Sequence, residues 1–362
     1  MNINKRKTMK NILKSALVFL TAFSFATANA GELSVSGTAQ ASYGITSSDA
    51  SGAGINAAKS IGVENDMSFK ASGETDGGFA WSYHNDFDAA GSIDDSRLAV
   101  TTPYGTIAFN SDEGGLGADT GWDQSAVSRP SDTQYDEGMA GEFDIADLTN
   151  IEYKLPAILP FDTTVEVAYA PGTETTVSDA GTAGSDNTYG AFTANSATAI
   201  SQTTDMMQSM TMYRVTTQPI EGLKLGASFT EFGNVGTLDQ NPESGAWYAT
   251  YAVGPASFGY GKVYIAYALS GLNDFIESVE GTSYSAAFAV NDDLTVSYTH
   301  EESNPDNQTA ATANYTLEST GIQAAYTMGG MTLSVAMNSH ENVAYTDGKD
   351  VKDTMFKVAF AF

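Results

Sequence analysis

The chain contains no cysteine, so neither a disulfide nor a thiolate ligand contributes to its structure. Long apolar runs are also missing after residue 30, where no stretch approaches the roughly 20 residues of a membrane-spanning helix. Apolar residues at helical spacing are hard to find in the same part of the chain. These absences exclude a disulfide scaffold and a helical membrane protein, and they leave hydrogen-bonded strands to hold residues 31–362 together.

Basic residues are scarce in this sequence. The 362 residues include 16 Lys and Arg against 44 Asp and Glu, a net charge of −28 at pH 7. Five of the bases and none of the acids lie in residues 1–30, so residues 31–362 carry 11 bases, 44 acids and a net charge of −33. This acidity argues against nucleic acid or an anionic membrane surface as a partner. The 18 Tyr and 18 Phe argue against disorder.

The first 30 residues have the three parts of a secretory signal peptide. A basic segment from Lys5 to Lys14 precedes an apolar segment from Ala16 to Phe25, and Ala28-Asn29-Ala30 forms a small-residue cleavage site. We predict cleavage after Ala30, which leaves residues 31–362 as a single domain. The alternative is a membrane anchor helix, but the apolar segment is shorter than the roughly 20 residues that a span needs.

Apolar and polar residues alternate with a period of two after residue 30, as in strands with one dry and one wet face. Short breaks with turn residues fall at 74–78, 103–105, 156–160, 218–222, 253–255, 291–293 and 328–330. Longer polar breaks alternate with them near 46–58, 89–93, 113–147, 171–204, 233–243, 270–277, 303–311 and 342–351. These breaks predict an all-β transmembrane antiparallel barrel of 16 strands with short periplasmic turns and long extracellular loops.

A soluble β-sandwich or a β-solenoid adhesin would also show alternation, and the aromatic residues favour the barrel over both. One group lies near the short turns: Trp81, Tyr104, Phe161 and Phe258. A second group lies near the long loops: Tyr43, Phe87, Tyr169, Phe232, Tyr267 and Tyr298. Two aromatic belts at opposite strand ends match the two interfaces of a membrane.

The alternation changes phase at two places, which predicts two β-bulges. Phe258 and Tyr260 are out of phase with Val263 and Ile265, and a bulge at Gly261 would restore the phase. A bulge near Gly321 would do the same between Tyr315-Thr-Leu317 and Ile322-Gln-Ala324.

The C-terminus ends inside a strand. Phe356, Val358, Phe360 and Phe362 share one face, and the chain stops on the last of them. In lipid such a strand needs a neighbour from a closed barrel, because an open edge leaves backbone groups unpaired. A terminal Phe is also the usual ending of outer-membrane barrels, so Phe362 is predicted to close the barrel.

The segment Tyr104-Gly-Thr-Ile-Ala-Phe109, followed by a Gly-rich acidic stretch over 113–147, resembles the fifth strand and third loop of bacterial general porins. The segment Asp132 to Gly138 resembles the centre of that loop, and the match is closest to the alphaproteobacterial porins. The resemblance covers all of residues 31–362 in strand count and loop order. As sequence it is specific only around 97–147 and at the C-terminus.

This resemblance implies that the third loop folds into the barrel and narrows the pore, with acids on the loop facing bases on the opposite wall. The implied loop acids are Asp119, Asp123, Asp132, Asp136, Glu137, Glu142 and Asp144. It also implies a homotrimer, in which small outward residues of the first strand, Gly37, Ala39 and Ala41, would let barrels approach closely.

Six bases lie on the polar parity of their strands, which predicts that they face the channel, because a charge facing lipid at mid-depth costs about 2–4 kcal/mol. They are Lys70, Arg97, Lys154, Arg214, Lys224 and Lys262. Only three arginines follow residue 30, so the wall is expected to be weakly basic. The alternative role for these bases is salt bridging that holds the loop in place.

These features predict an outer-membrane porin, a water-filled channel for passive diffusion of small hydrophilic solutes and ions, mildly cation-selective because acids favour cations in a pore. No enzymatic activity and no cofactor are expected, although Asp136 and Glu137 could bind a structural Ca²⁺. One alternative is a substrate-selective channel, for which Tyr264 beside Lys262 is the only hint. Another is a surface barrel whose loops 171–204 and 233–243 act as adhesin or receptor.

Overall fold

In the computed structural model, 16 antiparallel strands form one closed barrel. The structure describes residues 31–48, 58–87, 93–132, 139–171, 209–233, 240–267, 276–308 and 313–362. The predicted signal peptide, residues 1–30, lies outside this part of the chain.

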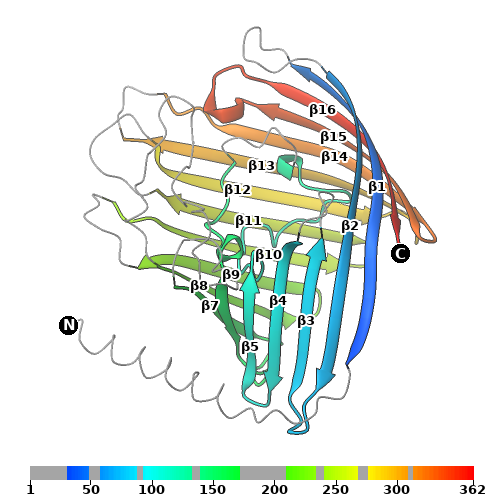
Figure 1. The fold of residues 1–362 in the computed structure, drawn as a ribbon. Coiled ribbons are helices and arrows are strands. Elements are labelled where there is room, and N and C mark those ends of the chain that lie inside the picture. The colour runs from blue at the N-terminus through cyan, green and yellow to red at the C-terminus, as the bar shows by residue number, and fades with distance from the viewer. Residues whose placement is uncertain are drawn as a thin grey trace.

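The strands follow one another around the barrel in chain order, as Figure 1 shows. Their bounds are β1 (Glu32–Ser48), β2 (Ala58–Glu74), β3 (Ala80–Phe87), β4 (Ile93–Thr102), β5 (Gly105–Ser111), β6 (Asn150–Lys154), β7 (Thr164–Ala170), β8 (Ser209–Ile220), β9 (Leu223–Gly233), β10 (Glu243–Val253), β11 (Ala256–Ala266), β12 (Ile276–Ala289), β13 (Leu294–Asn307), β14 (Leu317–Met328), β15 (Met331–Glu341) and β16 (Val351–Ala361). This order confirms the predicted all-β barrel and its strand number.

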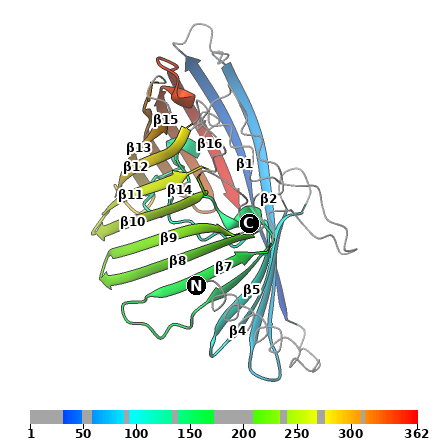
Figure 2. The ribbon, with the colours of Figure 1, turned by 90° about the vertical axis from the view of Figure 1, so that its left-hand side faces the viewer.

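The first and last strands close the barrel, and Figure 2 shows them side by side. Their pairing runs from Thr38 opposite Ala361 to Ser48 opposite Val351. Phe362 extends it by one residue: its N–H donates to Gly37 O at 3.0 Å, and its carbonyl accepts from Gly37 N at 2.9 Å. The alternating C-terminal segment thus has a partner along its whole length.

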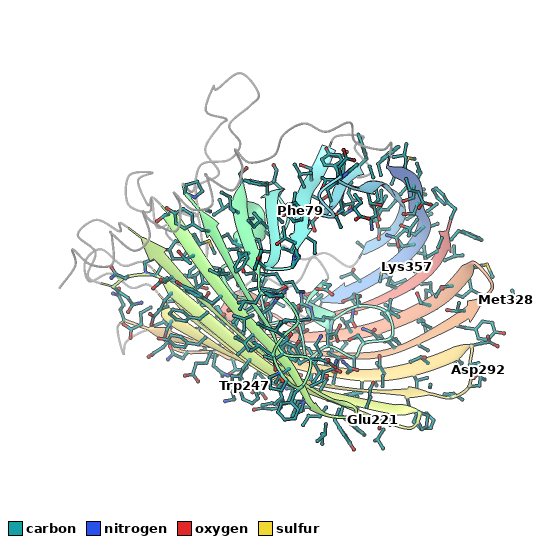
Figure 3. All side chains as sticks on the ribbon, turned by 90° about the horizontal axis from the view of Figure 1, so that it is seen from below. Phe79, Glu221, Trp247, Asp292, Met328 and Lys357 are labelled. Atoms are coloured by element: carbon teal, nitrogen blue, oxygen red, sulfur yellow. The ribbon has the colours of Figure 1, made fainter. Side chains whose placement is uncertain are left out.

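The connections at one rim are mostly short and those at the other mostly long, as predicted, although the β6–β7 connection, 155–163, is longer than the β3–β4 connection, 88–92. Figure 3 shows the first of these rims, where the short-turn residues Phe79, Glu221, Asp292 and Met328 are spread around the barrel. Gly222 shows why a turn needs glycine here: its φ is +80°, and a Cβ at this position would collide with Ala252 O.

The outer surface of the barrel is apolar. Ile61 and Val63 of β2 are 80% and 78% exposed, and Phe356 and Phe360 of β16 are also exposed. So many large apolar side chains pointing away from a closed barrel require an apolar surrounding.

Neither predicted bulge exists. The pairing of β11 with β10 and β12 is continuous through Gly261, and that of β14 with β13 and β15 is continuous through Gly321. In β11 the reason is that both faces are apolar: Phe258 and Tyr260 point outward, whereas Val263 and Ile265 are buried inside. The change of phase in the sequence therefore marks a second apolar face and not an extra residue.

An apolar core lies inside the barrel, on the inner faces of β7, β8 and β10 to β12. Phe232 and Tyr267, which we predicted to belong to a membrane belt, pack against Phe143 in this core. The prediction of their place was wrong, because the inner wall is covered by chain at this level and not by water.

The described parts of the loops contain three short 3-10 helices: η1 (Pro130–Asp132), η2 (Ile145–Asp147) and η3 (Val343–Tyr345). The last turns inward, where Val343 and Tyr345 are buried and the Tyr345 hydroxyl lies 2.8 Å from Ser303 Oγ. None of the helices in the described residues is long and apolar enough to cross a membrane.

Candidate channel and its inner loop

The long connection between β5 and β6, residues 112–149, is called L3 below. In Figure 1 its described part lies inside the barrel, over β9 to β14. β5 has only seven residues and ends at Ser111, so L3 leaves the wall low in the barrel. A loop that starts there must run along the inside of the taller strands.

A ladder of polar side chains binds the backbone of L3 to the wall. The N–H groups of Gln124, Ala126 and Val127 donate to Ser285 Oγ, Ser297 Oγ and Gln323 Oε1 at 3.0, 2.8 and 2.9 Å. These acceptors come from β12, β13 and β14, one strand after another. The other wall contacts of the L3 backbone include Phe143 N to Ser244 Oγ, Thr230 Oγ1 to Phe143 O, and Ser285 Oγ to Trp122 O, each at 3.0 Å. L3 therefore lies against the wall, and these backbone groups are hydrogen-bonded to it.

Trp122 anchors L3 at its centre. The side chain is 1% exposed, and its Nε1–H donates to Asp119 O at 2.6 Å. It lies on the inner face of β11 at Gly259 and Gly261, where a Cβ would collide with Trp122 O or with the indole ring. Two glycines on one face of a strand thus leave the space that the anchor fills.

Three predicted constriction acids, Asp119, Glu142 and Asp144, lie together at the two ends of L3. Asp144 accepts from Leu116 N and Gly117 N, both at 3.3 Å, and Asp119 accepts from Glu142 N at 3.1 Å. Glu142 Oε2 accepts from Ala118 N at 2.8 Å and from the Ser228 hydroxyl. These carboxylates hold the two arms of L3 to each other and to β9.

Burial changes the protonation of this cluster. It raises the pKa of Glu142 to about 7 from an ordinary value of 4.5, and it raises the pKa of Asp119 as well. The neighbouring carboxylates act in the same direction on Glu142, and its Oε1 atom is buried without a hydrogen-bond partner. The docked loop therefore favours a protonated Glu142.

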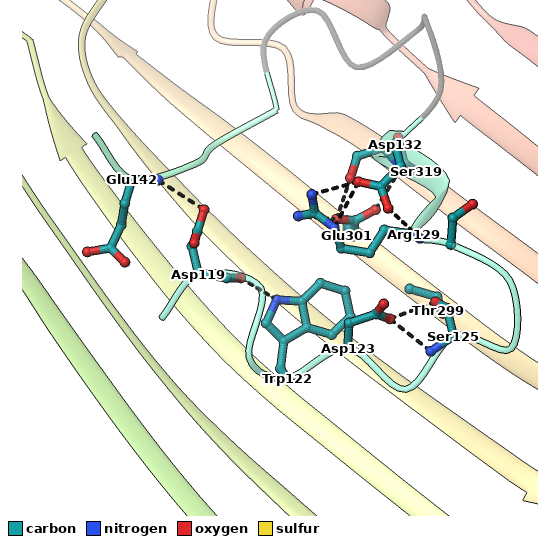
Figure 4. A network of polar contacts seen from close by, with 12 residues as sticks. Asp119, Trp122, Asp123, Ser125, Arg129, Asp132, Glu142, Thr299, Glu301 and Ser319 are labelled. Atoms are coloured by element: carbon teal, nitrogen blue, oxygen red, sulfur yellow. Dashed lines mark hydrogen bonds and ion pairs between the residues drawn. The ribbon is translucent and has the colours of Figure 1, made fainter. Parts of the chain in front are cut away.

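The other predicted acids of L3 divide into two groups. Asp123 accepts from the N–H and hydroxyl of Ser125 at 2.9 and 2.6 Å, and Asp132 pairs with Arg129 at 2.7 Å, as Figure 4 shows. Arg129 also lies 3.9 Å from the buried Glu301 of β13. Asp136 and Glu137, and with them the predicted Ca²⁺ position, lie outside the described residues.

Three predicted wall bases face inward and are paired with buried glutamates. Arg97 Nη1 lies 2.5 Å from Glu152 Oε2. Arg214 and Lys154 share Glu166, at 2.8 and 3.0 Å, and Arg214 also donates to Gly115 O of L3 at 3.2 Å. Arg97 of β4 thus reaches across β5 to an acid of β6, whereas Lys154 of β6 and Arg214 of β8 share one acid of β7, the strand between them.

The remaining three predicted bases lie in different surroundings. Lys70 shares the inner face of β2 with Ser68 and is opposite His84, and Lys224 lies over the Tyr248 ring at 5.8 Å from its centroid. Lys262 is on the outer face with Tyr260 and Tyr264, so the prediction that it faces the channel was wrong. In β11 the even-numbered residues of 258–264, which include the aromatic ones, point outward, and Lys262 is one of them.

The inner faces of β1 to β3 carry acids that the sequence reasoning did not nominate. Glu64 and Asp66 of β2 are exposed, with neutral partners on β1: Gln40 at 2.5 Å and Thr38 at 3.1 Å. Asp86 of β3 lies 2.8 Å from His84. Their polar parity was visible in the sequence, but nothing there distinguishes an open wall from a covered one.

Metal chemistry has little support among the described residues. No group of three or more His, Cys, Asp or Glu in that part of the chain is arranged to hold an ion.

Comparison with solved structures places the fold among the outer-membrane porins. The DcaP channel of Acinetobacter baumannii superposes with a TM-score of 0.62 at 12% identity, over 92% of this chain and 98% of that one. An anion-selective porin from Comamonas acidovorans gives 0.60 at 11% identity, over 92% and 100%. The trimer form of OmpT from Vibrio cholerae gives 0.57 at 11% identity, over 92% and 100%.

No family model and no curated protein matches the chain. The likeness at these identities is one of fold, and the narrower resemblance to alphaproteobacterial porins stays a prediction.

Proposed function

We propose that this protein is an outer-membrane porin: a water-filled channel through which small hydrophilic solutes and ions diffuse passively, with a mild preference for cations and no enzymatic activity. The observation that carries the proposal is the combination of a closed barrel, an apolar outer surface and a charged inner one. A barrel of 16 strands is wide enough for an aqueous channel. The likeness to solved porins supports the same reading.

The preference for cations is proposed from the charges inside the barrel. Arg97 is paired with Glu152, and Arg214 and Lys154 share Glu166, so these three bases leave a single net positive charge on their part of the wall. The exposed Glu64 and Asp66 are hydrogen-bonded to the uncharged side chains of Gln40 and Thr38, so their negative charges are not neutralised. A surplus of acid on a pore wall raises the local concentration of cations.

Four further parts of the proposal come from the sequence and its resemblance. Residues 1–30 would direct export and be removed, the short turns would face the periplasm, and L3 would narrow the channel. The barrel would assemble as a homotrimer, for which the trimer form of the Vibrio cholerae protein is a precedent in the same fold.

A planar-bilayer recording of the purified 31–362 protein tests this proposal. We expect stepwise conductance in groups of three and a reversal potential in a salt gradient that indicates cation preference. Absence of conductance from a folded, heat-modifiable protein would contradict the channel function and favour the adhesin or receptor alternative.

The substrate-selective alternative loses its only sequence hint, because Tyr264 lies on the outer face of β11. Most of loops 171–204 and 233–243, on which the adhesin alternative depends, lies outside the described residues. We therefore propose neither alternative as the main function.

A further inference from the structure

The two sets of acids inside the barrel are held in different ways. Several described acids of L3 accept hydrogen bonds from L3 itself: Asp144 from Leu116 and Gly117, Asp119 from Glu142, and Asp123 from Ser125. Glu113, at the start of L3, instead lies 3.7 Å from His84 of β3. The carboxylates of Asp144, Asp119 and Asp123 are directed at the fold of the loop. In a loop that lies against the wall, such carboxylates mainly stabilise the fold of the loop and interact less with a passing ion.

Glu64 and Asp66 are exposed on β2, whereas the start of L3 reaches β3, where Glu113 lies 3.7 Å from His84. L3 is bound to β9 through β14 by the Ser, Thr and Gln ladder, whereas these two acids project from β2. They are the seventh and ninth residues of a 17-residue strand, which places them at mid-height on one face. Both are exposed, and within the described residues no base lies at ion-pair distance from either.

The bases near this wall are few. Lys357 of β16 is paired with Ser42 of β1, which is two residues along the strand from Gln40, the partner of Glu64. Figure 3 labels Lys357 on the last strand. Lys70 lies four residues beyond Asp66 on the same strand face. The arginines of the neighbouring wall are engaged: Arg97 by Glu152 and Arg214 by Glu166.

We infer that Glu64 and Asp66 of β2, and not the described acids of L3, determine the charge selectivity of the channel. This inference rests on the proposed channel function and names the residues that would set its specificity. The partners they favour are small hydrated cations and cationic solutes passing along β1 to β3. L3 then has the separate role of filling the opposite half of the barrel.

The first test measures reversal potentials in a salt gradient for Glu64→Gln, Asp66→Asn and the double variant. A unit charge about 7 Å from a permeating ion in water changes the local ion concentration roughly threefold. Removing the charge lowers the cation concentration and raises the anion concentration by that factor, so we expect the cation-to-anion permeability ratio to fall about sevenfold for each single variant and further for the double variant, with single-channel conductance retained. Asp123→Asn removes a carboxylate of L3, and its ratio should stay near that of the unmodified protein.

A second test changes the charge after folding, so that a folding defect cannot imitate the result. Because the sequence has no cysteine, Glu64→Cys gives a single thiol. A cationic methanethiosulfonate reagent should shift the reversal potential toward anions, and an anionic one should restore cation preference. The matched control is Tyr43→Cys on the outer face of β1, where neither reagent should change selectivity.

The outcomes separate the inference from the proposed function. A conducting channel whose selectivity is unchanged by all variants at 64 and 66, and lost in Asp123→Asn, overturns the inference and leaves the channel function intact. Absence of conductance from the unmodified folded protein overturns the channel function itself.

Discussion

The inner faces of β9 to β14 and of β1 to β3 have opposite chemistry, although both alternate with the same period in the sequence. The first carries small, apolar and hydrogen-bonding side chains such as Gly261, Val263 and Ser297, and L3 lies on it. The second carries Glu64 and Asp66, which are exposed. The composition of an inward face therefore depends on what covers it. A wall covered by L3 must supply hydrogen-bond partners for the loop backbone, whereas a wall in contact with water can carry charged side chains.

The largest expected effect on this comparison comes from Trp122→Ala. Removing the buried indole from the inner face of β11 leaves a cavity, and we expect the docking of L3 to lose about 3–5 kcal/mol. The channel should then show larger and noisier conductance, and limited proteolysis should cleave L3 in a barrel that is still heat-modifiable. Trp247→Ala is the matched control, because Trp247 is 45% exposed on the outer face. Equal protease resistance of both variants would contradict the anchoring role.

A smaller effect is expected from Gly261→Leu, which fills the space of the anchor from the wall side. Overpacking of this kind costs typically about 1–3 kcal/mol. The loop should be displaced and the barrel retained, because the β11 pairing does not depend on the side chain. Ala249→Leu on the outer face of β10 is the control for added volume. If L3 is cleaved no faster in Gly261→Leu than in the control, the close approach of Trp122 is not needed for docking.

The docking of L3 should also depend on pH. Docking raises the pKa of Glu142 to about 7, so the docked state holds a proton that the free loop releases near pH 4.5. The stabilisation is therefore complete below about pH 4.5, falls as pH rises toward 7, and stays low above that, a change on the order of 3 kcal/mol. Hydrogen exchange of L3 measured from pH 5 to 8, corrected for intrinsic rates, should show this loss.

Glu142→Gln is the control for this pH dependence, because the amide keeps the acceptor for Ala118 N and carries no titrating charge. Its docking should remain uniform across the same pH range. A variant that keeps the full dependence would assign the proton to another group, with Asp119 as the next candidate because burial raises its pKa too.

The smallest effect is expected from Ser297→Ala, which removes one rung of the polar ladder. Ala126 N would lose its acceptor at 2.8 Å, at a cost of about 1 kcal/mol. The Ala126 amide should exchange several-fold faster, and the conductance should change little. Ser339→Ala on the outer face of β15 should leave that amide protected. Unchanged exchange in Ser297→Ala would mean that the rung contributes nothing to docking.

The bases show how far parity alone can predict a channel. Alternation placed Arg97, Lys154 and Arg214 correctly on the inner face, because their strands are apolar on the outer face only. It failed for Lys262, since β11 is apolar on both faces where L3 covers it. Gly259, Gly261 and Gly281 on the inner parity were the available signal, as glycines in a strand often mark the close approach of another part of the chain.

The sequence by itself determined the barrel: the strand number, the positions of the turns and the strand that closes it. These follow from period-two alternation, turn residues and an apolar C-terminal face, all of which are local. Only the tertiary structure decided that L3 lies on β9 to β14, that its acids bind its own backbone, and that Glu64 and Asp66 remain open. Those facts depend on which segments meet across the barrel, and contacts between residues more than a hundred positions apart leave no periodic trace in the chain.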